Sequence, residues 1–251
     1  MVLTHHEREP PEVGDTTFHF LDASPADALA RAKELAGGLD VRIGGGVGRR
    51  GRDGRSGANA EFVQRLADGD TSDESGASPR MVFRSSYVAP GFSDDHENLW
   101  VESMLSTRTG EDNYPRDGAP SESWPGFGAG GRDVLNTMSG VRLDLTGIVD
   151  LLNKPAILWV HGSVDAIVGD ESFFDLHTLG KHGIIPGWPG EDVAPPQPII
   201  AQTRAVLGRY SAAGGEVRVE LFEGAGHSPH LEDPERFRRV VEEYLGAAEG
   251  R

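Results

Sequence analysis

The 251-residue chain contains no cysteine. This absence excludes disulfide bonds, thiolate nucleophiles and zinc sites with sulfur ligands. Long apolar runs are absent as well: the N-terminal segment MVLTHHEREPPE has no apolar core, and no stretch approaches the length of a membrane span. We therefore expect no secretory signal, no membrane partner and a soluble, cytoplasmic protein.

Positive charge is scarce. The chain has 24 Lys and Arg against 40 Asp and Glu, a formal net charge of -16. Nucleic acids and anionic membrane surfaces would be repelled by this excess of negative charge. We expect a small-molecule substrate rather than a nucleic-acid partner, and the sequence leaves the oligomeric state open.

The C-terminal part has the clearest secondary-structure pattern. Ile157–Val160 is an unbroken apolar run, typical of a strand buried on both faces in a parallel sheet, and a second strand is expected over Val217–Phe222. Amphipathic spacing predicts a helix over Ile199–Ala213 and another that begins at Asp233-Pro234. The alternation of strands and helices predicts an α/β fold, a parallel sheet with helical cover.

One acid and one histidine follow these two strands. Asp165 comes just after the first strand and His227 just after the second. In open α/β sheets, ligands and reactive groups lie beyond the carboxyl ends of the strands. A Ser-His-Asp hydrolase needs such a pair, because the acid holds the imidazole in one tautomer while the imidazole takes and returns a proton. We therefore expect the two side chains at the same edge of the sheet, within or near hydrogen-bond distance of each other. The alternative is that both residues are ordinary solvated loop residues.

The segments PAILWVHGSVDAIV and GAGHSPHLEDPERF together resemble the C-terminal part of the α/β-hydrolase family. The resemblance extends over about residues 59–246. It implies that Asp165 is the triad acid, that His227 is the triad histidine, and that the reaction is hydrolysis of an ester or a related small molecule. By this resemblance, residues 59–153 form a cap or lid and residues 154–251 the C-terminal part of the fold.

The nucleophile of that family has no match in the chain. The G-x-S-x-G motif of its strand-to-helix turn does not occur; Gly162-Ser163 comes closest, but Ser163 stands two residues before Asp165 without the flanking glycines. The strands that precede the nucleophile in the family are missing as well. We therefore expect an incomplete hydrolase-like core, a truncated or fused chain, and weak or absent ester hydrolysis.

The N-terminal segment 1–48 has a strand-helix-strand pattern. A helix is expected to open at Ser24-Pro25-Ala26-Asp27 and to run to about Ala36, and a strand is expected over Val41–Ile43. VLTHHEREP, TTFHFLDASPADALARAKELAGG and DVRIGGGVG resemble the dihydrofolate-reductase-like family that includes the riboflavin-biosynthesis reductase domain. The resemblance would place Gly44, Gly45 and Gly46 against the pyrophosphate of NADPH. Because the substrate-binding strands of that family are absent, we expect a fragment with no bound cofactor. Residues 49–58, which include the Gly/Arg-rich stretch RRGRDGRSG, are expected to be a linker.

The region between the linker and the first C-terminal strand is less regular. Residues 61–67 are helix-like, Met81–Val88 fits a helix or a strand, and a helix is expected over Asp94–Leu105. Ser106–Gly131 is predicted to be a long polar loop, and its aromatic residues suggest a lid.

Two rival functions stay open at this point. One is an NADPH-dependent reductase, based on residues 1–48; the other is a non-catalytic product of gene fusion or truncation. A serine close to His227 would favour the hydrolase, and a cleft over Gly44–Gly46 would favour the reductase. His227, His230 and Glu232 are candidate metal ligands, but their spacing matches no helical metal motif, so no metal is expected.

Overall fold

The computed structural model describes residues 2–3, 12–13, 16–17, 20–21, 25–36, 59–110, 113–115, 117–132, 136 and 144–249. The chain divides into two compact units, Met1–Gly44 and Gly45–Arg251. This division lies close to the predicted end of the first segment at residue 48. The linker expected over residues 49–58 lies outside the described residues, as do the strand expected over Val41–Ile43 and the glycines Gly44, Gly45 and Gly46; the description resumes at Asn59.

The first unit contains short strands and one helix. β1 (Val2–Leu3) pairs in parallel with β4 (Phe20–Leu21), and β2 (Glu12–Val13) pairs antiparallel with β3 (Thr16–Thr17). α1 runs over Pro25–Ala36, with Pro at its first position and Asp27 in its first turn, as the sequence pattern predicts.

The second unit begins with helices. The elements in chain order are α2 (Ala60–Asp68), α3 (Pro79–Val82), the single π-helical turn η1 (Phe83–Tyr87) and α4 (Glu97–Leu105). Asn59 caps α2 by accepting a hydrogen bond from the amide of Glu61, and Gly69 ends it with φ of 70°. The ambiguous segment Met81–Val88 is therefore helical up to Tyr87, and the helix expected from Asp94 begins at Glu97.

Ion pairs join α3 and η1 to α4. Arg84 donates from Nε and Nη2 to the two carboxylate oxygens of Glu97, each at 2.8 Å, and Arg80 donates to the same carboxylate at 2.5 Å. The hydrogen bonds from Arg84 lower the pKa of Glu97, and this effect is larger than the opposing effect of burial. This two-arginine clamp fixes the segment that ends at Tyr87.

The region predicted to be a long loop contains four short strands, which corrects that expectation. β5 (Thr109–Gly110) pairs in parallel with β6 (Tyr114–Pro115), and β7 (Gly118–Pro120) pairs antiparallel with β8 (Phe127–Ala129). Each has only two or three residues. Strands this short carry no alternation of apolar and polar residues that a sequence pattern could detect.

The C-terminal part forms the unit on which the candidate site rests. It contains η2 (Thr146–Asp150), β9 (Ile157–Gly162), α6 (Leu176–Lys181), α7 (Ile199–Ala212), β10 (Val217–Phe222), α8 (Pro229–Glu232) and α9 (Pro234–Glu249). β9 and β10 pair in parallel, with Ile157 opposite Val217 and Gly162 opposite Phe222. The chain is therefore mixed α/β with small parallel sheets, the coarse form of the predicted fold class.

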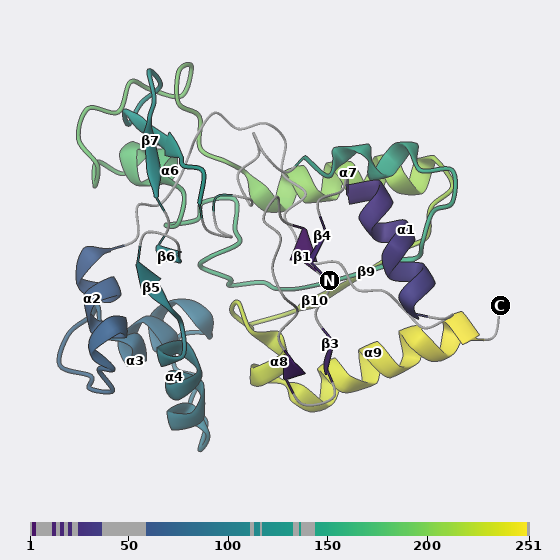
Figure 1. Ribbon diagram of the computed structural model, residues 1–251, viewed down its shortest axis with the longest axis horizontal. Coiled ribbons are helices and arrows are strands. Elements are labelled where there is room, and N and C mark those ends of the chain that lie inside the picture. The colour runs from purple at the N-terminus through teal and green to yellow at the C-terminus, as the bar shows by residue number, and fades with distance from the viewer. Residues whose placement is uncertain are drawn as a thin grey trace. The chain divides into compact units, whose positions relative to one another are not determined.

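Helices cover the β9–β10 pair, and Figure 1 shows α7 and α9 on its two sides. Toward α9, Leu158 and Val160 pack on a cluster that includes the buried Phe222 and Val240. On α7, four side chains are buried, Thr203, Val206, Leu207 and Tyr210. The hydroxyl of Tyr210 donates to the carbonyl of Pro155, two residues before the start of β9. These contacts hold β9 at its amino end through Tyr210 and along its length through Leu158 and Val160.

In the described part of the chain, no helix has the length and apolar character that a membrane crossing requires.

Candidate functional site

Asp165 lies on the turn that follows β9, and its side chain is only 6% exposed. Oδ1 accepts hydrogen bonds from the amides of Ile167 at 2.8 Å and Val168 at 2.9 Å. Burial by itself raises the pKa of Asp165. The hydrogen bonds from His227 and from the two amides outweigh burial, so that the pKa lies below its ordinary value of 3.8. Asp165 is thus held as a carboxylate.

His227 lies on the loop that follows β10. Its Nδ1 is 3.0 Å from Oδ2 and 3.2 Å from Oδ1 of Asp165, so the expected contact between the two side chains is confirmed. Because an ionised carboxylate only accepts hydrogen bonds, Nδ1 carries the proton in this contact. Nε2 of the neutral ring is then left with a lone pair, and the side chain is 33% exposed. This is the arrangement of a general base with its orienting acid.

The two loops are joined through their backbones. The amide of Ser163 donates to the carbonyl of Phe222, and the amide of Val164 donates to the carbonyl of Ala225, each at 3.0 Å. A Cβ on Gly162 would overlap the carbonyl oxygens of Ala225 and Gly226. Glycine at position 162 therefore lets the end of β9 approach the loop that carries His227.

Ser163, the serine closest to the missing motif, has a different role. Its Oγ accepts a hydrogen bond from the amide of Gly224 at 2.8 Å, which links the two loops again. Among the described residues, Asp165 is the hydrogen-bond partner of the His227 side chain, and no serine hydroxyl takes that place. The described part of the chain thus brings together the acid and the histidine without a nucleophilic serine.

Two residues that sequence reasoning did not assign to the site contact the His227 loop. Tyr87, at the end of η1, packs edge-on against the His227 ring with 5.8 Å between the centroids. Glu232, on α8, accepts hydrogen bonds from the amides of Gly226 and Ala89. No local pattern marks Tyr87, which lies 140 residues before His227 in the chain. The sequence marks Glu232 only as a candidate metal ligand.

Its two backbone contacts give the Glu232 carboxylate a role other than metal binding. In the described part of the chain, no group of three or more His, Cys, Asp or Glu side chains could hold a metal ion. The three glycines expected to face NADPH lie outside that part, so the structure describes no cofactor contacts for them.

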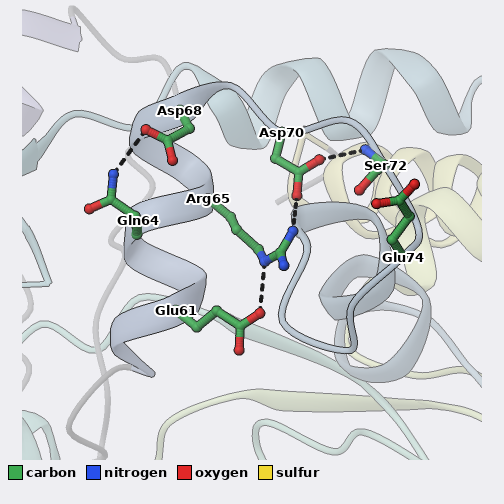
Figure 2. A pocket seen from close by; sticks show the side chains of 7 residues that line it. All are labelled: Glu61, Gln64, Arg65, Asp68, Asp70, Ser72 and Glu74. Atoms are coloured by element: carbon green, nitrogen blue, oxygen red, sulfur yellow. Dashed lines mark hydrogen bonds and ion pairs between the residues drawn. The ribbon is translucent and has the colours of Figure 1, made fainter.

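A surface hollow of about 500 Å³ lies along α2 and the loop after it, away from Asp165 and His227. Figure 2 shows Arg65 pointing between Glu61 and Asp70, and it donates to them at 2.9 Å and 2.6 Å. The amide of Ser72, together with Arg65, lowers the pKa of Asp70 to about 2. The charged groups of this hollow pair mainly with one another, which indicates a structural role.

Comparison of the chain with protein-family models, with curated proteins and with solved structures finds no match.

Proposed function

We propose that this chain carries the histidine and acid of an α/β-hydrolase-type site and hydrolyses esters or related small molecules, with water as the attacking group. The proposal rests above all on one observation, the 3.0 Å contact between Nδ1 of His227 and Oδ2 of the buried Asp165. The order β9–α6–α7–β10–α8–α9, with the acid after one parallel strand and the histidine after the next, also supports a core of this type.

The proposed reaction follows from the protonation of the pair. Asp165 stays ionised and accepts the Nδ1 proton, so Nε2 of His227 can take a proton from a water molecule. The oxygen of that water attacks the ester carbonyl. The imidazolium then returns its proton to the departing alkoxide, and the products are a carboxylic acid and an alcohol. Asp165 stabilises the imidazolium throughout without becoming protonated.

Water rather than serine is the nucleophile because no serine hydroxyl bonds to His227 in the described part of the chain. A positioned general base contributes about 100- to 10,000-fold to the rate of such a reaction. Preorganised oxyanion donors supply a further large factor in complete hydrolases. The proposed activity is therefore slow compared with that of a complete serine hydrolase.

Turnover of a p-nitrophenyl ester tests this proposal. Because exposed imidazoles can also cleave activated esters, the matched control is His96→Ala, which removes a side chain that is 70% exposed. We expect His227→Ala to abolish the rate above background and His96→Ala to leave it unchanged. A fluorophosphonate probe should label no residue; stoichiometric labelling of one serine would replace water by that serine as the nucleophile.

A further inference from the structure

We propose that Glu232 is a positioning residue for His227, an assignment that rests on the function proposed above. Glu232 ends the short helix α8, which begins two residues after His227. Its carboxylate joins the loop that carries His227 to the segment around Ala89, more than a hundred residues earlier in the chain. It thereby fixes the two backbone segments on either side of the imidazole.

The two oxygens of the carboxylate have separate partners. Oε1 accepts the amide proton of Gly226, the residue before His227, at 2.8 Å. Oε2 accepts the amide proton of Ala89, also at 2.8 Å. Hydrogen bonds to an ionised acceptor are about twice as strong as neutral ones. Removing the carboxylate would leave two backbone donors in a partly buried place without partners, which is costly.

The segments that Glu232 joins are also in close contact. Gly226 is buried, and a Cβ on it would lie 2.6 Å from the carbonyl carbon of Val88 and 2.7 Å from the amide nitrogen of Ala89. On its other side, the carbonyl oxygen of Gly226 lies against Gly162 at the end of β9. The backbone before His227 is thus packed between two other backbone segments, and the carboxylate ties it to one of them.

The same link sets the position of Tyr87. This residue lies two positions before Ala89, and its ring meets the His227 ring edge-on, at an interplanar angle of 84°. Tyr87 therefore packs against one side of the imidazole, while Asp165 forms the hydrogen bond with Nδ1. If Glu232 is removed, both the loop and the ring against it gain freedom, and the contact between His227 and Asp165 loosens.

The tautomer of His227, read from the ¹⁵N shifts of the two ring nitrogens in the full-length protein, tests this assignment without requiring turnover. The His227→Ala protein identifies the signals. In the native protein we expect the Nδ1–H tautomer. In Glu232→Gln, the oxygen of the side-chain amide can still accept from one backbone N–H, but its NH2 group faces the other N–H, which then has no acceptor. We expect the ratio of the Nδ1–H to the Nε2–H tautomer of His227 to fall at least about tenfold in this variant. The control Glu242→Gln, on the exposed side of α9, should keep the native ratio.

The outcomes separate the two proposals. A native protein without the Nδ1–H tautomer would contradict the proposed function itself. A native Nδ1–H tautomer that is unchanged in folded Glu232→Gln would overturn the role of Glu232. Where that variant does not fold, Glu232→Asp, which is too short to reach both amides, is measured in the same way. Amide hydrogen exchange in the native protein adds a further check: protection of both Ala89 and Gly226 supports the link, and unprotected amides contradict it.

Discussion

The ring of Tyr87 stands edge-on to the imidazole of His227, with 5.8 Å between their centroids, although the two residues come from opposite parts of the second unit's sequence. Burial raises the pKa of Tyr87, so its hydroxyl stays protonated at neutral pH and adds no negative charge beside the imidazole. The edge-on ring therefore acts on His227 through packing.

Replacing Tyr87 tests the value of this packing. An edge-to-face aromatic pair contributes about 0.5–1.5 kcal/mol beyond its buried area. We expect Tyr87→Ala to lower p-nitrophenyl ester hydrolysis about tenfold, whereas Tyr87→Phe, which keeps the ring, should retain the native rate within about twofold. An equal loss in both variants would assign the effect to the hydroxyl instead of the ring.

The close approach of β9 to the His227 loop predicts a stability difference between two glycine substitutions. A Cβ on Gly162 meets carbonyl oxygens of Ala225 and Gly226, whereas a Cβ on Gly208, within α7, meets nothing within 4 Å. We expect Gly162→Ala to lower the free energy of unfolding by about 1–3 kcal/mol. Gly208→Ala should raise it by about 0.5–1 kcal/mol, because alanine loses less backbone entropy in a helix. Urea denaturation measures both, and equal effects would contradict the described packing.

The pKa of Asp165 predicts how stability depends on pH. Because its pKa in the folded chain lies below the ordinary value of 3.8, the unfolded chain binds a proton more readily. The stability contributed by the carboxylate is therefore present above pH 3.8 and is lost as the pH falls through the lower pKa of the folded state. We expect the difference in unfolding free energy between the native protein and Asp165→Asn to shrink from pH 5 to pH 2. A constant difference over this range would show that the carboxylate gains nothing on folding.

The glycine-rich stretch Gly44–Gly46 gives a prediction drawn from the sequence alone. Because residues 1–48 resemble only a fragment of the reductase-like family, we expect no NADPH binding at micromolar concentrations. Isothermal titration of the full chain with NADPH measures this. Micromolar affinity that is lost in Gly45→Leu would favour the reductase alternative.

The elements that carry the acid and the histidine could be predicted from the sequence because their patterns are local. The apolar run over Ile157–Val160 and the run over Val217–Phe222 indicate β9 and β10, and Asp233 caps α9 by accepting a hydrogen bond from the amide of Arg236, as expected. The order of acid and histidine after these strands predicted their contact.

The rest of the site depends on tertiary contacts. Tyr87 reaches His227, and Glu232 reaches Ala89, only because α3 and η1 fold back onto the loop after β10, and no residue spacing records that. The strands β5 to β8 are too short to have a period. The roles of Asp165 and His227 in catalysis, and the resemblance on which they were assigned, stay predictions.

The most direct test of the account is the rate of ester hydrolysis as a function of pH in the native protein and in Asp165→Asn. Only a neutral imidazole can take a proton from water, so the two proteins are compared at the pH where each rate is highest. Asp165→Asn, whose amide group cannot hold Nδ1–H as a carboxylate does, should lower this highest rate at least about tenfold, since the asparagine favours the wrong tautomer. A highest rate that is equal in the two proteins would show that Asp165 does not orient a catalytic histidine, and would contradict the proposed function.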